Sequence, residues 1–442
     1  MSRTTRVRAF WRIAPLVALT TTVSATVALR LDHKASPAAT VVPRSLVRSA
    51  PAAPIESLPR VLDLPADASI TGGAPHTLHG DARHTHRAHG HLPKRPETLW
   101  TFRADGPVEG QVVLSPDEAT LYVATLGGTL WALDRAGHAR FSVKLGARAY
   151  GTPCIAPDGT IYVGSDGGAL FAVDPGGHIE WKLETVGDAD SGPVMLDDDL
   201  VVFAAGSRVY GVRRGGVLAF RFQAKGKVFS GPALANAPLA RETSIVFGAQ
   251  DHRVYSLRRD GTLRWSVDVG HDVDSSPAIG DDGGIFVGTD GDEVVRLDGE
   301  GRIVWRAPVG GMVRGALSIA RNGDVLAGVY GPTPRIVRLS AGAGTVLGAF
   351  AIRGNGTRAT GVVGGPLEDD DGALAFGGQD GWLHVVGADG FERWSYDAHA
   401  DIDAPATLLA DGSLVFETYD GDVVALGAGL DAAAGVDAPR AK

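Results

Sequence analysis

The side chains with the most evident chemistry are histidines gathered in one short stretch. The run "HTLHGDARHTHRAHGH" contains six of them: His76, His79, His84, His86, His89 and His91. Imidazole nitrogens are ligands for borderline transition metals, so this stretch can capture an ion such as Zn²⁺. A biased, solvated linker has the same composition, and no periodicity here fixes a coordination geometry. We favour the linker and assign no metal ligand.

Three runs of carboxylates raise the question of calcium binding. They are "LDDDL" (residues 197–199), "GDDGG" (281–282) and "EDDDG" (368–371). Calcium loops alternate their ligands along the chain, because neighbouring side chains point apart. Contiguous aspartates are typical of solvent-facing turns, where they hydrogen-bond to the backbone. We therefore interpret these runs as turns and expect no calcium cofactor.

The remaining chemical signals are sparse. The chain has one cysteine, Cys154, so neither an intramolecular disulfide nor a CxxC site can form. Cys154 follows Pro153, and we interpret it as a small buried apolar residue. The chain contains no GxSxG or HExxH motif and no phosphate-binding glycine loop before a helix. We therefore assign no catalytic and no cofactor-binding residue, and we expect a protein that is not an enzyme.

These residues stand in or beside a repeated unit. Its clearest copy, "GTPCIAPDGTIYVGSDGGALFAVDPGGHIEWKL", begins at Gly151 and contains four short alternating runs separated by turns. Asp-Gly and Gly-Gly pairs supply the left-handed backbone of tight hairpin turns. Four antiparallel strands in about forty residues make one blade of a β-propeller. We call the position of Pro153 in each copy the anchor.

The unit occurs eight times. Prolines hold six of the eight anchors, and Val112 and Leu317 hold the other two; the prolines are Pro153, Pro193, Pro232, Pro277, Pro366 and Pro405. The eighth copy ends at "ALGAGL" without a fourth strand, whereas "LWTFRA" around Trp100 is a fourth strand without a blade. We predict an all-β fold: a single eight-bladed β-propeller of four-stranded antiparallel blades, closed by an N-terminal strand that completes the last blade.

Aromatic residues begin most fourth strands. We interpret them as structural residues that dock into the neighbouring blade; they are Trp100, Phe141, Trp181, Phe220, Trp265, Trp305 and Trp394. The sixth copy has Leu347 near this position. A substrate-stacking role is the alternative, but the regular recurrence favours packing.

The segments outside the repeats have a different character. Arg3, Arg6, Arg8 and Arg12 precede the uncharged run from Ile13 to Leu29, so residues 1–30 are predicted to be a signal peptide or an N-terminal membrane anchor. Cleavage after Ala25 is one alternative and retention is the other. Residues 31–95 are predicted to be a disordered Ala/Pro/His-rich tether, 96–429 the propeller and 430–442 a disordered tail.

The charge distribution separates these regions. Residues 1–95 have a formal charge of +8 and the rest −17. An acidic folded region argues against nucleic-acid binding. The leader favours an exported protein that is periplasmic, membrane-anchored or extracellular, with the membrane contacted only through the N-terminal segment. The oligomeric state is open.

The connections that enter the inner strands of a propeller converge on one mouth of the ring, where scaffolds usually place binding residues. Exposed loop ends are also simply polar, which is the alternative. The residues that we expect to contact a ligand or partner there are Glu109, Arg148, Asp190, Asp274, Arg314, Arg353, Arg358 and Asp403. The insertion "AIRGNGTRATGVVGG" (351–365) lengthens one of these connections and is the best candidate for a partner contact. A second insertion, 235–244, lengthens a turn between strands.

One segment carries a resemblance. "YVGSDGGALFAVDPGGHIEW" resembles the pyrroloquinoline-quinone (PQQ)-type propeller repeat through Gly164, Ser165, Ala172, Asp174, Gly177 and Trp181, and the resemblance covers residues 96–429. That repeat is found in quinoprotein dehydrogenases and in BamB-like periplasmic propellers that are not enzymes. The enzymes use a disulfide between adjacent cysteines near the quinone, which one cysteine excludes. The lipoprotein members carry an acylated cysteine, which is absent after the apolar run.

From these patterns we expect an exported propeller that is a protein- or ligand-binding scaffold of the cell envelope, with a role like outer-membrane protein assembly as its narrower form. Its partners would be envelope proteins or a small polar ligand. Two alternatives stay open. One is a PQQ- or metal-dependent oxidoreductase, which the repeat type alone suggests. The other is an extracytoplasmic sensor or surface-recognition domain.

Overall fold

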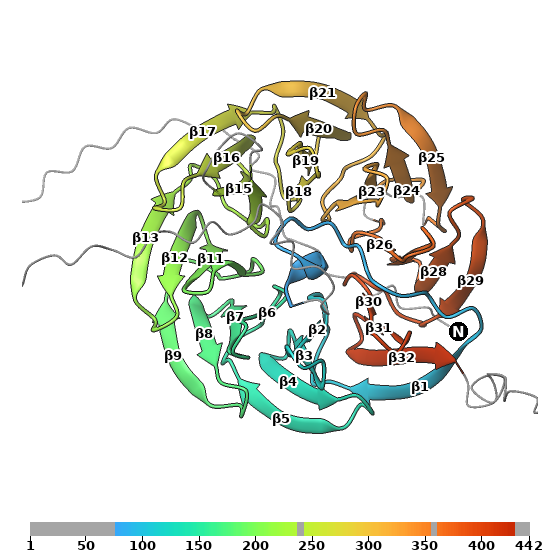
Figure 1. The fold of residues 1–442 in the computed structure, drawn as a ribbon, viewed down its shortest axis with the longest axis horizontal. Coiled ribbons are helices and arrows are strands. Elements are labelled where there is room, and N and C mark those ends of the chain that lie inside the picture. The colour runs from blue at the N-terminus through green and yellow to red at the C-terminus, as the bar shows by residue number, and fades with distance from the viewer. Residues whose placement is uncertain (1–75, 237–242, 355–359, 429–442) are drawn as a thin grey trace, which may run out of the picture. The chain divides into compact units, whose positions relative to one another are not determined.

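The fold is a ring of four-stranded antiparallel sheets. In the computed structural model, which describes residues 76–236, 243–354 and 360–428, eight such sheets follow one another around a central axis (Figure 1). Each sheet is one blade, with its first strand nearest the axis and its fourth on the outside. The predicted fold class is therefore confirmed. The predicted leader, most of the tether and the tail lie outside the described residues.

Short inner strands and longer outer strands recur in every blade, because the space between blades widens with distance from the axis. In the first four blades the strands are β2 (Val113–Leu114), β3 (Thr120–Ala124), β4 (Thr129–Asp134), β5 (Ala139–Lys144); β6 (Cys154–Ile155), β7 (Ile161–Ser165), β8 (Ala169–Val173), β9 (Ile179–Glu184); β10 (Val194–Asp197), β11 (Leu200–Ala205), β12 (Arg208–Arg213), β13 (Leu218–Gln223); and β14 (Ala233–Asn236), β15 (Thr243–Ala249), β16 (Arg253–Leu257), β17 (Leu263–Asp268). In the last four they are β18 (Ala278–Ile279), β19 (Ile285–Gly288), β20 (Glu293–Leu297), β21 (Ile303–Pro308); β22 (Ser318–Ile319), β23 (Val325–Val329), β24 (Arg335–Leu339), β25 (Val346–Ala351); β26 (Leu367–Glu368), β27 (Leu374–Gly377), β28 (Trp382–Val386), β29 (Glu392–Asp397); and β30 (Thr407–Leu408), β31 (Leu414–Glu417), β32 (Asp422–Ala428), β1 (Pro96–Arg103). One short 3₁₀ helix, η1 (Leu78–Gly80), precedes them. Among the described residues no helix has the length and apolar character needed to cross a bilayer.

Strand β1 closes the ring. It pairs antiparallel with β32 from Pro96↔Ala428 to Arg103↔Asp422, so the last blade takes three strands from the end of the repeat array and one from its start. Figure 1 shows blue β1 beside red β32 at the outer edge of this blade. The pairing leaves no sheet with an unpaired third strand, and such an edge would invite aggregation.

The hydrophobic core lies between blades rather than within any one of them. Each cluster of buried side chains joins two neighbouring blades, and most clusters contain a large second-strand aromatic such as Tyr162, Phe203, Phe247 or Phe286. A single sheet could not bury both of its faces, so each blade depends on its two neighbours. Cys154 is buried in its inner strand with 2% of its surface exposed.

The outer-strand aromatics dock on glycines of the next blade. The rings of Trp100, Trp181 and Trp265 lie against Gly137, Gly216 and Gly301, each of which has a positive φ and has no room for a Cβ atom. The indole N–H donates to a backbone carbonyl of the same turn, for example from Trp100 to Arg135 O at 2.9 Å. The turn glycine therefore supplies both the backbone conformation and the ring platform.

Trp394 docks differently, because the eighth blade has no turn between its third and fourth strands. Its indole N–H donates to Pro93 O at 2.7 Å. The N-terminal segment thus replaces the missing turn of the interrupted blade, at the seam between the seventh and eighth blades.

The seam between the eighth and first blades contains a second replacement. Every other second strand has glycine or alanine where β31 has Glu417. Glu417 is fully buried, and its Oε1 accepts the N–H of Val112 at 2.6 Å. Val112 holds an anchor that is proline in six blades, and proline has no N–H. Burial raises the pKa of Glu417 well above its usual value, which favours the neutral carboxyl group.

The pairing of Glu417 with Val112 can be tested by a double-mutant cycle. Glu417→Ala leaves the buried N–H of Val112 without an acceptor, which we expect to cost about 1–3 kcal/mol in the free energy of unfolding. Adding Val112→Pro removes that N–H, so the double variant should be more stable than Glu417→Ala alone. Denaturant unfolding measures both values. Equal or lower stability of the double variant would contradict the explanation.

Candidate functional site

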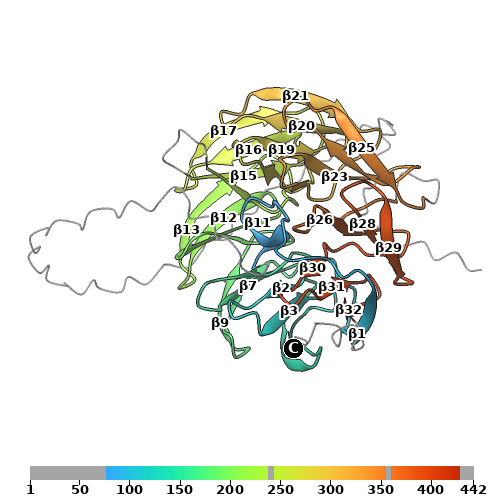
Figure 2. The ribbon, with the colours of Figure 1, turned by 45° about the vertical axis from the view of Figure 1, so that its right-hand side comes forward.

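The centre of the ring is filled by residues 76–92, which we call the hub segment. Its backbone carbonyls accept N–H groups from the inner strands of several blades: His76 O from Ile155, Ala82 O from Leu234, Arg83 O from Ile279, Thr85 O from Ile319 and His86 O from Glu368, at 2.7–3.0 Å. Figure 1 and Figure 2 show the segment as the blue trace on the axis. It then passes outward, where Leu92 packs with buried residues of the seventh and eighth blades.

Side chains extend these contacts to the other blades. Thr77 Oγ1 donates to Pro193 O at 3.1 Å, in the third blade. His76 Nδ1 lies 2.8 Å from Leu114 O of the first blade, and His86 Nε2 lies 3.1 Å from Ala406 O of the eighth. The hub segment therefore lies against every blade of the ring and hydrogen-bonds to the first seven of them.

Three histidines of the hub segment are buried side by side. His79, His84 and His86 are 0%, 1% and 3% exposed. Their Nδ1 atoms lie 2.9–3.1 Å from the backbone oxygens of Leu317, Pro277 and Gly365. The His79 and His86 rings are stacked, with centroids 4.3 Å apart. All three residues have φ between 56° and 58°, a conformation in which histidine is more common than most non-glycine residues.

Burial keeps these imidazoles neutral. Desolvation lowers the pKa of His79 well below its usual value, and the neighbouring His86 and His84 lower it further. Desolvation also lowers the pKa of His84, and it lowers that of His86 to about 4. Each neutral ring can donate its Nδ1–H to a carbonyl, and the side-chain amide of Gln111 lies 3.3 Å from His86 Nε2.

The prediction of a disordered tether is therefore wrong for residues 76–95, which are ordered. Polar composition suggested a solvated linker, but the partners of these side chains are backbone carbonyls of the inner strands. A sequence pattern does not reveal such partners, because eight separate repeats supply them. Among the few apolar residues of the hub segment only Leu92 is buried. Residues 31–75 lie outside the described part of the chain.

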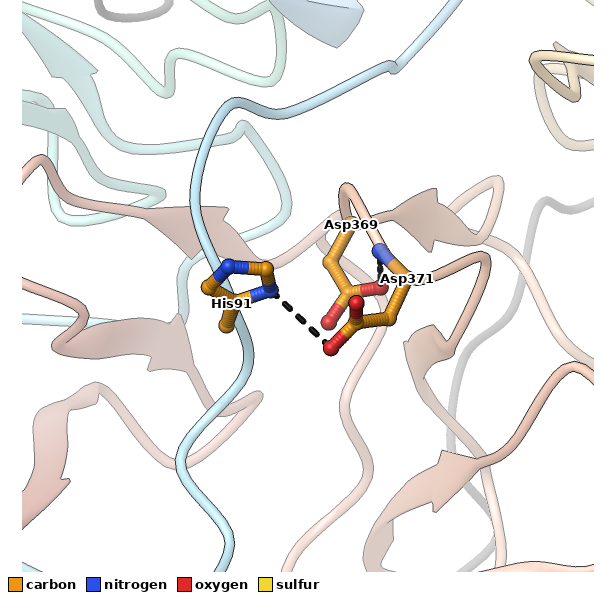
Figure 3. Close-up of side chains that lie close together, drawn as sticks. All are labelled: His91, Asp369 and Asp371. Atoms are coloured by element: carbon orange, nitrogen blue, oxygen red, sulfur yellow. Dashed lines mark hydrogen bonds and ion pairs between the residues drawn. The ribbon is translucent and has the colours of Figure 1, made fainter.

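Most histidines of the run are not free to bind a metal ion, because backbone oxygens of the inner strands already engage them. His79, His84 and His86 are hydrogen-bonded in the hub. His91 remains exposed and lies 3.0 Å from Asp371, with Asp369 beside them (Figure 3). Asp369 already accepts backbone N–H groups from Leu92, Asp371 and Ala373. This group offers an ion two exposed ligands and one that the backbone already engages.

The acidic turns have structural partners. Asp281 pairs with Arg83 and Arg87 of the hub segment, and Asp282 pairs with Arg296. In the first run, Asp197 and Asp199 pair with Arg259 and Arg213. These contacts agree with the interpretation of the runs as turns.

Most of the predicted mouth residues form one electrostatic network. Arg148 binds Asp166 at 2.9 Å, and Arg314 holds Asp290 with two bonds of 2.8 and 2.5 Å. Asp403 is 4% exposed and accepts Gln379 Nε2 at 2.9 Å. The charges of Asp403, Arg314, Glu109 and Asp290 all act on the buried Tyr330 and so link the two sides of the network. Sequence reasoning identified six of its charged members but missed Asp166, Asp290 and Tyr330.

The mouth holds carboxyl groups that resist ionisation. Burial raises the pKa of Glu109 to about 8, with Asp403 and Asp166 adding to the rise. Burial and a hydrogen bond with Asp166 raise the pKa of Asp190 to about 8. Burial raises the pKa of Asp274 to about 6. One oxygen each of Asp190 and Asp274 has no hydrogen-bond partner within the described structure. Asp166, Asp188 and Asp190 bring their oxygens within 4.8 Å of one another.

Two predicted residues are not in this network. Arg353 lies over the ring of Trp382, 5.4 Å from its centroid, and lines a hollow near Asp380 and His384. His384 there contacts the carboxylates of Asp380 and Glu392, whose hydrogen bonds raise its pKa against burial. Arg358, with residues 355–359, and most of the insertion 235–244 lie outside the described residues.

Comparison with known proteins places this geometry in a family. The family model described as outer membrane protein assembly factor BamB matches residues 93–215, 155–259 and 250–347, which together span more than half of the chain. The chain belongs to this BamB family. A search of curated proteins gives no match.

Solved structures share the fold at low sequence identity. BamB from Moraxella catarrhalis is 16% identical, with a TM-score of 0.61 over 76% of this chain and 100% of that one. Quinohemoprotein alcohol dehydrogenase from Comamonas testosteroni is 13% identical, with a TM-score of 0.68 over 82% of each chain. A europium-containing methanol dehydrogenase is 11% identical, with a TM-score of 0.63 over 80% of this chain and 98% of that one.

These similarities correct one expectation. We predicted that the chain is not an enzyme, since no catalytic motif was found. That prediction is wrong, because dehydrogenases share the same fold. Membership of the BamB family does not decide between binding and catalysis. A propeller can carry its reactive groups in loops of different repeats, where a linear motif search does not find them.

Metal binding at His91 can be tested directly. We expect Zn²⁺ to bind weakly, with a dissociation constant of 10 μM or more by titration calorimetry, because the ion gains few free ligands. His91→Ala should abolish the binding, whereas His86→Asn should leave it unchanged. Binding that survives His91→Ala would place the metal elsewhere.

Proposed function

We propose that this protein is a binding propeller of the cell envelope whose acidic mouth receives a positively charged segment of a partner protein. The observation that carries the proposal is the set of half-buried carboxyl groups at the mouth, Glu109, Asp190 and Asp274, whose pKa values are raised. A lysine or arginine side chain would supply the missing charge and the missing hydrogen bonds.

Two further features support an envelope location and a protein partner. Residues 1–30 have the pattern of an export leader. The BamB family is described by its role in outer-membrane protein assembly, so proteins of that process are the first partners to seek. The arginines of the mouth, Arg148 and Arg314, are paired with Asp166 and Asp290, so the carboxyl groups set the sign of the site.

The proposal predicts that binding strengthens as the pH rises. Glu109 and Asp190, with pKa values of about 8, are largely protonated at pH 6.5 and ionised at pH 9. A cation binds the ionised form, so we expect affinity for a tetralysine peptide to rise about tenfold or more over this range. Calorimetry at both pH values measures this, with tetraglutamate as the peptide control.

Matched variants distinguish binding by the carboxyl groups of the mouth from binding by the general surface charge. Glu109→Gln with Asp190→Asn should remove the pH dependence and the capture of partners from an envelope extract. Glu97→Gln with Glu180→Gln removes two exposed carboxylates outside the mouth and should change neither. If both pairs of substitutions weaken binding equally, surface charge alone explains it and the proposal fails.

A redox function is the second candidate, favoured by the fold shared with quinohemoprotein and methanol dehydrogenases. The oxygens of Asp166, Asp188 and Asp190 are close enough to hold a divalent cation. The stacked rings of His79 and His86 fill the hub, so a planar quinone could not enter the ring beyond that level with the hub segment in place.

The two candidates predict different responses to PQQ. A binding propeller should leave the absorbance of PQQ unchanged in the presence of Ca²⁺ and should not reduce a dye with alcohols. Stoichiometric quinone binding with dye reduction would overturn the first candidate in favour of the second.

A further inference from the structure

The hub segment is fixed by interactions that differ from those of the rest of the ring. Most of the inter-blade clusters contain no residue of the hub segment, and only Ala82, Ala88 and Leu92 contribute to the others. The pairing of β1 with β32 closes the ring without it. The ring therefore keeps its packed seams and its closure if the hub segment leaves.

Protonation of His79 would destabilise the bound hub segment more than protonation of the other two histidines. Its Nδ1–H donates to Leu317 O, and its Nε2 is buried with no hydrogen-bond partner in the described residues. A second proton would create a buried charge, and burial opposes that charge more strongly than the backbone contacts with His84 and Leu317 favour it. That charge would also lie against the stacked ring of His86.

His86 and His84 add to this effect in different ways. Both nitrogens of His86 lie near carbonyl oxygens, of Gly365 and Ala406, so its cation would find acceptors. His84 has the oxygen of Pro277 at Nδ1, and its ring centroid lies 6.2 Å from that of His79. A proton on any of the three disfavours a proton on the others, unless the segment moves into water.

The charged groups around the histidines do not offset the cost of protonating them in the hub. On the segment itself, the Asp81 carboxylate accepts the hydroxyl of Thr85 and the N–H of Arg83, and it favours the cations of His84 and His86. Arg83 and Arg87 pair with Asp281 of the fifth blade. From the seventh and eighth blades come the buried Glu368 and Glu417, and burial raises the pKa of each.

We propose that the hub segment is a proton-sensitive plug, which seals the centre of the propeller while His79, His84 and His86 are neutral and leaves it, with the ring intact, when they are protonated. This inference does not depend on what binds at the mouth.

The sign of the effect follows from linkage. The buried histidines have lower pKa values than exposed ones, so the released segment binds more protons than the bound segment below about pH 6.5. The seal is therefore fully stable above that pH and weakens as the pH falls. For His86 alone, with a pKa of about 4 in the hub, the equilibrium shifts toward release by about thirtyfold between pH 7.5 and pH 5.

Cys154 reports on the seal. It is the only cysteine of the chain, is 2% exposed, and hydrogen-bonds with Thr77 of the hub segment. Its neighbour Ile155 donates its N–H to His76 O. When the segment leaves, this thiol loses its cover. The full chain can be labelled with a pyridyl disulfide, a reagent that reacts at acidic pH, and the rate is divided by that of glutathione at the same pH.

We expect the normalised labelling rate to rise at least tenfold from pH 7.5 to pH 4.5, while near-UV circular dichroism stays unchanged. The triple variant His79→Asn, His84→Asn and His86→Asn should show a flat profile, because asparagine keeps an N–H donor, tolerates positive φ and does not titrate. His89→Asn with His91→Asn changes two exposed histidines and should retain the wild-type rise.

The proposal is overturned if the wild-type rate is flat, if it rises only together with loss of the near-UV signal, or if the triple variant shows the same rise. Should the triple variant fail to fold, hydrogen exchange in the wild-type chain decides. Amides of Leu234, Ile279 and Ile319, which donate to the hub segment, must lose protection at pH 4.5 before amides of β3 and β7 do. Simultaneous loss contradicts release from an intact ring.

Discussion

A blade of this propeller cannot bury its two faces alone, so the whole fold depends on the meeting of its first and last strands. The β1–β32 pairing joins them, and one local replacement on each side of the eighth blade completes its packing. Pro93 supplies the carbonyl that a turn supplies elsewhere, and Glu417 accepts the N–H that a proline anchor would lack. The interrupted blade is thus held by contacts that the seven continuous blades do not need.

Closing the ring creates a second requirement at its centre. The inner strands end with backbone N–H and C=O groups that face the axis, and buried groups of this kind must be paired. The hub segment pairs such groups in seven blades and lies against the eighth. Histidine suits this place, because a neutral imidazole donates to a carbonyl, packs flat against another ring and tolerates positive φ. The same choice makes the centre sensitive to protons.

The mouth differs from the hub, because its ionisable groups are carboxyl groups rather than neutral histidines. Glu109 and Asp190 are half-buried there, and burial raises the pKa of each to about 8. The BamB family and the dehydrogenases share the scaffold, so the fold alone does not choose between binding and catalysis. The choice rests on the side chains that each chain places at the mouth, and here these are suited to a cation.

The sequence by itself determined the blade count, the turn glycines, the docking aromatics and the closing strand, because each is a local pattern that repeats every forty residues. It also indicated which loops converge, which is why Glu109, Asp190 and Arg314 could be named. Only the tertiary structure decided the place of the histidines, the raised pKa values and the pairing of Glu417 with Val112. Those depend on partners from distant repeats, and burial and hydrogen bonding between distant repeats leave no local periodicity in the chain.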